Sequence, residues 1–324
     1  MPGRQPEPVM REVSDAVCDD IVLPFAVEQL DIRGRLVRLG PSISCILSRH
    51  DYPAPVARLV AEAAALTALM ATALKFEGQF QLQARGDGAV SMLIVDFDFP
   101  DRLRALARFK PEMLADADRR KDLLGIGHLA VTIDPGGEMT RHQGIAALRG
   151  QGLEDAAYQY FRHSAQIPAR VRLAAAEDIS GAGRRWRAGG LMIQLLPPSA
   201  RQTAGNGLKP GSAPLNLEGR AHSEQAAWAE AASLAATIED HELVDPALSS
   251  ERLLYRLFHR HGVKVFSPQP VREACRCSDE RITALLRGFS PQERQDMTGD
   301  DGKIGVTCEF CSAFRAFDPK DFDS

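Results

Sequence analysis

Two closely spaced pairs of cysteines near the C-terminal end constrain this chain more than any other feature. The first pair is Cys275-Arg276-Cys277 and the second, thirty residues later, is Cys308-Glu309-Phe310-Cys311. Structural Zn²⁺ sites are tetrahedral and take up to four thiolates at about 2.3 Å. Because four of the six cysteines fall within 37 residues, the spacing predicts one four-cysteine zinc site rather than unpaired thiols or permanent disulfides.

The residues around these cysteines predict a small module of two short helices and a β-hairpin over residues 271–324. Ser278 is a helix N-cap, with apolar residues at helical spacing at Ile282, Leu285 and Leu286. A second helix start follows at Ser290–Glu293, which has the capping-box pattern. Lys303–Thr307 and Ala313–Phe317 are expected to form the strands on either side of the second cysteine pair.

A module of this size cannot rely on apolar burial alone. A domain of about 60 residues buries only about 60% of the surface of its unfolded chain. Structural zinc contributes about 10–16 kcal/mol of apparent binding energy near pH 7. We therefore expect the metal to hold the module folded, so that oxidation of the thiolates unfolds it.

Charge argues against binding to nucleic acid or to an anionic membrane. The chain has 39 Lys and Arg against 43 Asp and Glu, and residues 271–324 contain eight basic and eleven acidic side chains. A zinc module that binds phosphates needs a basic face. A zinc-ribbon nucleic-acid binder stays as an alternative, which salt-dependent retention of DNA or RNA would favour.

The N-terminal residues predict a flexible tail rather than a secretion signal. Residues 1–20 are rich in charge and proline and have no apolar core. The longest apolar run, Leu59–Leu74, contains Glu62 and is short for a membrane span. We expect a cytoplasmic protein, in which clustered cysteines are reduced and bind metal or sense redox state.

Residues 21–197 predict an α+β core domain of sheet and helix. A long helix is expected over Pro53–Phe76, since a wide apolar stripe runs along it and Gly78 follows it. Gly86-Asp87-Gly88 is a hairpin signal rather than a phosphate loop, because no P-loop lysine follows. A second helix is expected over Leu153–Ala165. The expected strands are Ile21–Val27, Ile32–Leu39, Phe80–Arg85, Ala89–Phe97, Arg102–Phe109, His128–Asp134, Arg170–Ala176 and Leu191–Leu196.

Two segments separate the core from the module. Residues 198–222 are rich in Pro and Gly and are expected to form a loop or insertion. Residues 223–270 predict a helical linker, with one helix capped by Ser223 and reaching Ile238, and another over Ser249–His261. Seven of the sixteen residues of the first helix are Ala, so it should form readily and dock weakly. A metastable linker and an ordinary connector are both compatible with this composition.

With these motifs the chain resembles the 33 kDa chaperonin family of redox-regulated chaperones from the bacterial cytosol. The spacing of Cys275, Cys277, Cys308 and Cys311 matches the family's four zinc ligands, and the segment around residues 199–222 is longer than the family's. The other segments that carry the resemblance are Arg33–Leu39, Ser48–Pro53, Leu74–Gly78, Gln83–Gly88, Tyr160–Pro168 and Gly190–Pro197.

The resemblance implies a holdase that works without ATP and is switched by oxidative stress. The reduced form, with one Zn²⁺, is inactive. Oxidation forms two disulfides, here Cys275–Cys277 and Cys308–Cys311, with release of zinc and unfolding of the module and linker. The exposed surface then binds unfolded client proteins, and the active form tends to form a homodimer.

Other candidate residues are interpreted more simply. Cys18 and Cys45 lie far from the cluster and are expected to be incidental thiols. His259 and His261 lie at the end of a predicted helix, where positive charge suits the helix dipole, and are not expected to be metal ligands. Gly181-Ala182-Gly183 is expected to be a loop. We find no catalytic constellation and expect no enzyme. A thiol–disulfide oxidoreductase using Cys308 and Cys311 is a second alternative, although no thioredoxin-like βαβ pattern precedes them.

Overall fold

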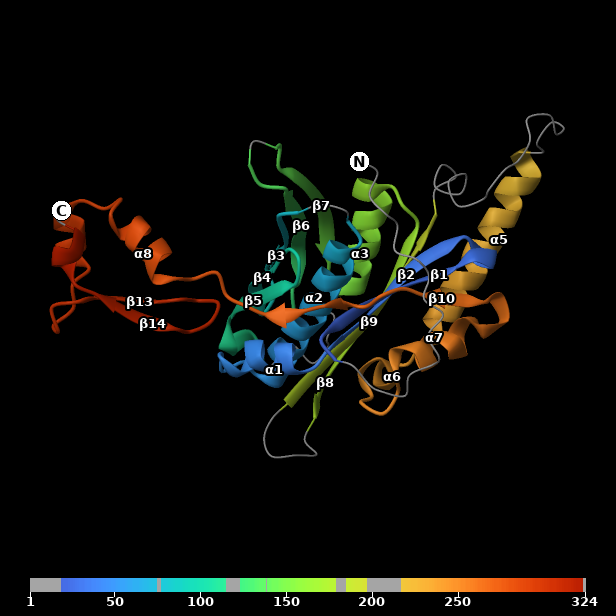
Figure 1. Cartoon of the computed structure of the whole chain (residues 1–324), viewed down its shortest axis with the longest axis horizontal. Coiled ribbons are helices and arrows are strands. Elements are labelled where there is room, and N and C mark those ends of the chain that lie inside the picture. The colour runs from blue at the N-terminus through green and yellow to red at the C-terminus, as the bar shows by residue number, and fades with distance from the viewer. Residues whose placement is uncertain are drawn as a thin grey trace.

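The computed structural model describes residues 19–74, 77–114, 123–137, 139–178, 185–196 and 217–322, without the side chains of 217–223. The chain has the expected α+β architecture, with a large N-terminal core of sheets and helices and a small C-terminal module. Figure 1 shows the module at one end of the core and the linker helices at the opposite end. The expected tail, residues 1–20, falls outside the described part except for Asp19 and Asp20.

The first sheet has six strands and is antiparallel throughout, in the order β10-β1-β2-β9-β8, with β11 also pairing with β1. The expected strands Ile21–Val27 and Ile32–Leu39 are confirmed at both ends. Strand β8 is longer than expected at both ends, and β9 begins six residues earlier than expected and ends one residue earlier. The strands are β1 (Ile21–Val27), β2 (Ile32–Leu39), β8 (Ala169–Asp178), β9 (Arg185–Leu195), β10 (Val263–Val265) and β11 (Gln269–Pro270).

The second sheet also has six strands, in the order β12-β5-β4-β3-β6-β7. The hairpin predicted about Gly86–Gly88 is confirmed, since β3 and β4 pair directly on either side of it. A Cβ at Gly86 would lie 1.8 Å from the carbonyl oxygen of Leu124, so the turn requires glycine there. The strands are β3 (Gln79–Gly86), β4 (Val90–Asp98), β5 (Arg102–Phe109), β6 (Ile126–Asp134), β7 (His142–Arg149) and β12 (Arg272–Glu273).

Helix α2 (Ala54–Thr72) lies between the two sheets and contacts strands of both. Its residues are buried around most of the circumference, which explains an apolar stripe wider than a surface helix needs. By length and composition alone it could cross a membrane, but most of its apolar stretch is buried in the core. The helix ends at Thr72, so the expected end at Phe76 is wrong: the chain must reverse into β3 at Gln79.

Helices α1 (Pro41–Ser48) and α3 (Leu153–Tyr160) and strand β7 also belong to the described part of the core. Helix α3 continues into a π-turn, Phe161–Ala165, which confirms the predicted helix over this stretch. Helix α1 and strand β7 were not predicted. Helix α1 begins after Gly40, which has no side chain to cap it, and the distant carboxylate of Asp20 instead accepts hydrogen bonds from the N–H groups of Gly40 and Ser42, both at 2.9 Å. Strand β7 is an edge strand that leaves Ile145 exposed.

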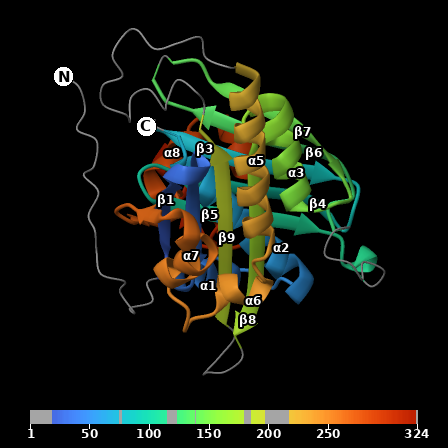
Figure 2. The same cartoon turned by 90° about the vertical axis from the view of Figure 1, so that its right-hand side faces the viewer.

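The linker helices cover the outer face of the first sheet, as Figure 2 shows for α5 (Leu217–Ala236), α6 (Asp240–Val244) and α7 (Ser250–Phe258). Side chains alternate along β1, so Val22 packs into the core with α2 while Leu23, Phe25 and Val27 pack under the linker. The linker residues buried on this face are Ala231, Ala235, Ile238, Leu243, Leu253, Leu254, Leu257 and Phe258.

Several details of the predicted linker are wrong. Helix α5 begins at Leu217, so Ser223 lies inside it and is not its cap, and residues 217–222 are helical rather than loop. Helix α7 is capped by Ser249, the residue at which the helix was expected to begin, but the α-helix ends at Phe258, before a 3₁₀ turn over His259–His261. Helix α6 was not predicted, because five residues are too few to show a periodic pattern.

The linker also ends in strands rather than helix. Strands β10 and β11 pair with β1 in the first sheet, and β12 then pairs in parallel with β5 in the second sheet. Val271, between β11 and β12, is buried in the main core. The chain is therefore attached to both sheets immediately before it reaches Cys275.

Candidate metal centre

The C-terminal module has the predicted secondary structure. Ser278 caps α8 (Asp279–Leu286) by accepting a hydrogen bond from the backbone N–H of Arg281, and Ser290 forms the predicted capping box at α9 (Pro291–Asp296). Strands β13 (Ile304–Thr307) and β14 (Phe314–Phe317) form the hairpin. Leu285, expected on the apolar face of the first helix, is instead exposed.

The hairpin turn and the start of α8 bring the four cysteines together. Between β13 and β14 the N–H of Ser312 donates to the carbonyl of Cys308 at 2.8 Å, and the N–H of Cys308 donates to the carbonyl of Ala313 at 3.0 Å. This tight turn places Cys308 and Cys311 on one side of the four-sulfur cluster. Cys275 and Cys277 lie in the extended segment between β12 and α8, opposite the turn.

The four sulfur atoms have the spacing of a tetrahedral site. All lie within 4.8 Å of one another, with Cys275 Sγ 3.7 Å from Cys308 Sγ and Cys277 Sγ 3.3 Å from Cys311 Sγ. Sulfurs held at about 2.3 Å from a common zinc ion would lie about 3.8 Å apart. The four cysteines are thus positioned to bind one metal ion, as the sequence predicted.

As free thiols, Cys275, Cys277 and Cys311 have pKa values shifted in different directions. Burial alone would raise the pKa of Cys275, but hydrogen bonds from Cys277 and from Arg104 lower it to about 7. Burial and the neighbouring sulfurs raise the pKa of Cys311 to about 12, and burial raises the pKa of Cys277. A divalent cation at the centre would stabilise all four thiolates at once, so the electrostatics of the cluster favour a bound metal.

Apolar packing within the module is slight. Its buried apolar residues, among those described, are Ile282, Leu286, Ile304 and Phe322, with three half-buried side chains around them. Fully burying one aliphatic or aromatic side chain contributes about 1.5–3 kcal/mol. Four such residues are a small core for a module of this size. We therefore expect a bound metal to supply much of the module's stability.

The cluster lies at the junction between the module and the core, where the hairpin turn faces β5 and α1 (Figure 1). Arg108 of β5 contacts Glu309 at 2.7 Å, His50 Nε2 lies 3.1 Å from the carbonyl oxygen of Phe310, and Ser312 Oγ donates to the carbonyl of Arg49 at 2.7 Å. The second cysteine motif is therefore in direct contact with the core domain.

Arginines donate to the sulfur atoms from both sides. Arg315, in β14, places NH1 3.4 Å from Cys277 Sγ, and Arg104, in β5, places NH1 3.8 Å from Cys275 Sγ. Sequence reasoning did not identify Arg104 or its partner Asp96. The available signal was the pair Asp96 and Asp98, two carboxylates on the polar face of a strand whose other face is apolar.

The remaining sequence candidates are not brought to the cluster. Cys45 is exposed and lies 3.6 Å from a carboxylate oxygen of Glu273 and from Arg49 NH2, outside the four-sulfur group. His259 Nδ1 contacts the carbonyl of Arg256, and His261 pairs with Glu230 at 3.1 Å. Cys18 and Gly181–Gly183 lie outside the described residues.

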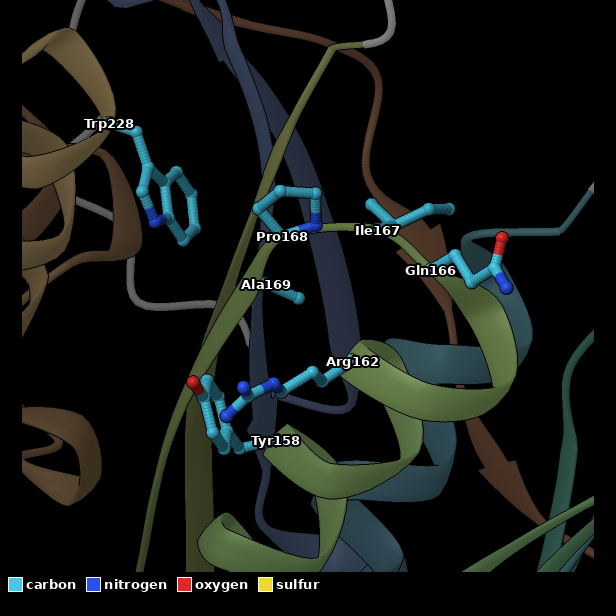
Figure 3. A pocket seen from close by; sticks show the side chains of 7 residues that line it. All are labelled: Tyr158, Arg162, Gln166, Ile167, Pro168, Ala169 and Trp228. Atoms are coloured by element: carbon cyan, nitrogen blue, oxygen red, sulfur yellow. The ribbon is translucent and has the colours of Figure 1, made fainter. Parts of the chain in front are cut away.

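A half-open hollow of about 320 Å³ separates linker helix α5 from α3. Figure 3 shows Trp228, from α5, facing Pro168 and Ala169 across it, with Tyr158 and Arg162 on α3 and the π-turn. Among the described lining residues the one charged side chain is Arg162, so the lining offers no acid–base pair. The hollow shows that the only large aromatic of α5 does not fill the space beneath it.

Comparison with known proteins places this architecture in one family. The sequence model of the family described as Hsp33 protein matches residues 20–318. The chain is 42% identical over 309 residues to a 33 kDa chaperonin of Caulobacter vibrioides, covering 94% of this chain and 96% of that one. A 33 kDa chaperonin of Shewanella woodyi is 34% identical over 297 residues, covering 92% of each chain.

A solved structure shows the same fold. The crystal structure of the 33 kDa chaperonin of Thermotoga maritima superposes with a TM-score of 0.73 at 18% identity, covering 94% of this chain and 97% of that one. At that identity the likeness concerns the arrangement of sheets and helices alone.

Proposed function

The chain belongs to the Hsp33 protein family, and from that premise we propose that it is a redox-regulated holdase chaperone whose switch is a zinc centre formed by Cys275, Cys277, Cys308 and Cys311. The observation that carries the proposal is the four-sulfur cluster in a module with so little apolar core. Membership of a family named for chaperones supports the chaperone role itself.

In the proposed resting state the protein is reduced and binds one Zn²⁺ through the four thiolates. Zinc has no redox chemistry of its own in such a site; it stabilises the thiolates and the module. The donor set supports zinc over harder cations, because soft thiolate ligands select against Mg²⁺ and Ca²⁺. The linker helices then cover the outer face of the first sheet, and the chaperone is inactive.

Oxidation would remove the ligands and the metal together. A thiolate attacks the O–O bond of a peroxide and becomes a sulfenic acid with release of hydroxide; a neighbouring thiol then condenses with it to give a disulfide and water. In the structure the two short sulfur–sulfur distances, 3.7 and 3.3 Å, are between a cysteine of the first motif and one of the second. The pairing Cys275–Cys277 and Cys308–Cys311 is therefore proposed from the family resemblance and not from these distances.

Loss of the metal would release the module and then the linker. Helices α5, α6 and α7 bury apolar residues of the first sheet, including Leu23, Phe25, Leu36 and Ile193. Their departure would expose a continuous apolar surface that binds unfolded clients without ATP. An exposed surface of this kind also supports a homodimer of the oxidised form. We propose a cytoplasmic location, where reduced thiols are the resting state.

Two observations weigh against the alternative functions. The net acidic module disfavours a zinc ribbon that binds nucleic acid. Cys308 and Cys311 lie in the turn of an antiparallel hairpin rather than in the strand-to-helix turn of a thioredoxin-like enzyme.

Light scattering of a heat-denatured client tests the proposal. Protein pretreated with peroxide should suppress aggregation at near-stoichiometric ratios and should release its zinc to a chromophoric chelator, whereas reduced protein should do neither. Equal suppression in both redox states would contradict the switch, and failure in both would remove the chaperone assignment.

A further inference from the structure

Arg276, the residue between the first two cysteines, extends away from the sulfur cluster and into the core domain. Its guanidinium lies on the polar face of the second sheet, with NH1 2.7 Å from Gln79 Oε1, NH2 2.9 Å from Asp96 Oδ2 and Nε 3.3 Å from Asp98 Oδ2. Asp96 and Asp98 are only 1% and 6% exposed. A residue held on both sides by cysteines of the cluster thus occupies a buried acidic site in the core.

Arg104 of β5 shares the same carboxylate. Its Nε and NH2 donate to Asp96 Oδ2 at 2.8 and 2.5 Å, while Gln81 donates to Asp96 Oδ1 at 2.8 Å. The remaining nitrogen, NH1, faces Cys275 Sγ at 3.8 Å, and the guanidinium carbon lies 3.9 Å from the centre of the Phe310 ring. One core side chain therefore contacts both cysteine motifs.

The contact between the Arg104 guanidinium and the cysteine cluster is electrostatically favourable while the four thiolates are held together. Four thiolates carry more negative charge than one divalent cation neutralises, so a nearby guanidinium stabilises the cluster. On the sheet, the positive charges of Arg104 and Arg276 compensate the negative charges of Asp96 and Asp98. Removing one charge would leave a buried carboxylate or guanidinium without a partner, which is strongly disfavoured.

We propose that Arg104 and Arg276, held by the buried Asp96, are outer-shell positioning residues of the metal centre, so that metal retention and docking of the module on the second sheet form one linked equilibrium. The inference rests on the proposed function in taking the four cysteines to bind zinc. Linkage is reciprocal: if docking tightens metal binding, then the metal must tighten docking by the same factor.

The first arm of the test measures zinc affinity of the reduced full-length chain by competition with a chromophoric chelator. Replacement of outer-shell partners typically weakens metal binding about 10-fold to 100-fold, and we expect a loss in that range for Arg104→Gln and for Arg276→Gln. Arg287→Gln is the matched control, since Arg287 is an exposed arginine of the same module with no ion pair among the described contacts. Arg104→Lys, which keeps the charge, should recover part of the loss.

The second arm measures docking at two backbone amides. The N–H of Arg272 donates to the carbonyl of Asp101 at 2.8 Å and the N–H of Ala274 to that of Leu103 at 3.1 Å, so their hydrogen exchange reports on attachment to the second sheet. Exchange at both should accelerate when zinc is removed from the wild type. It should also accelerate in zinc-loaded Arg276→Gln, while strand β4 stays protected and shows that the core is folded.

The outcomes separate this inference from the proposed function. Wild-type protein that binds no zinc would overturn both. If the wild type binds zinc tightly, the proposed role of the two arginines is tested separately. Arg104→Gln and Arg276→Gln variants that match the wild type in zinc affinity and in hydrogen exchange at Arg272 and Ala274 would overturn that role and leave the proposed function standing.

Discussion

Replacement of Phe258 by alanine should release the linker from the first sheet without any oxidant. The side chain is fully buried, and its ring lies 5.7 Å from that of Phe25 in β1. Truncation of a buried Phe to Ala costs about 3–5 kcal/mol. Each 1.4 kcal/mol changes an equilibrium constant about tenfold, so the undocked population should rise by about two to three and a half orders of magnitude.

The structure makes undocking and unfolding of this segment one event. Helix α7 has nine residues, and isolated helices shorter than about 12–15 residues are marginal in water. Most of its stability must come from the apolar face that packs on the sheet. Loss of that contact should therefore melt the helix and uncover the apolar side chains of β1 and β2.

Two measurements on the reduced, zinc-loaded variant test this reasoning. Hydrogen exchange should accelerate across residues 217–258, and the variant should suppress aggregation of a heat-denatured client without peroxide. Tyr255→Ala is the control, because Tyr255 lies in the same helix with 59% of its surface exposed; it should behave like the wild type. A Phe258→Ala protein with fast exchange in the linker but no chaperone activity would refute the claim that uncovering this sheet activates the protein.

Three further predictions follow from the same contacts. Cys308→Ser should abolish stoichiometric zinc binding measured with a chelating dye, whereas Cys45→Ser, at an exposed thiol outside the cluster, should retain it; zinc binding by Cys308→Ser would contradict the assigned ligand set. Gly189→Ala should destabilise the docked linker by about 1–3 kcal/mol, seen as faster exchange in α6, because a Cβ there would lie 2.1 Å from the carbonyl oxygen of Leu243; unchanged exchange would contradict this. Burial lowers the pKa of His50 below its usual value of 6.5; the nearby Arg49 lowers it further, while the hydrogen bond with the Phe310 carbonyl raises it. The unfolded chain therefore binds a proton at His50 more readily than the folded protein does, and the free energy of unfolding should decrease as the pH falls from 7 through this range, as followed by denaturant titration. His50→Gln should remove the part of that dependence due to His50, and an unaltered profile would contradict it.

The sequence predicted elements well where a local pattern was sufficient. Strands β1, β2 and β5 match their predicted bounds to the residue, because their composition and flanking turns mark them. Ser278 and Ser290 cap the predicted helices because capping depends on residues within one turn. The cysteine cluster was recognisable for a similar reason, since ligand spacing is a short-range property.

Prediction failed where neighbours distant in sequence decide the structure. Helix α5 begins before Ser223 despite the capping signal, and strands β10, β11 and β12 are two or three residues long and exist because β1 and β5 offer free edges. The contact of Arg104 with Cys275 joins residues 171 positions apart, and that of Arg276 with Asp96 joins residues 180 positions apart. No local pattern contains that information.

Hydrogen exchange of the module with and without metal tests the central claim most directly. The four buried apolar residues cannot hold it folded, while zinc supplies about 10–16 kcal/mol. Removal of zinc from the reduced protein by a chelator should therefore abolish protection of β13, β14 and α8 while β4 stays protected. A module that keeps the protection of β13 and β14 after all metal is gone would contradict the account.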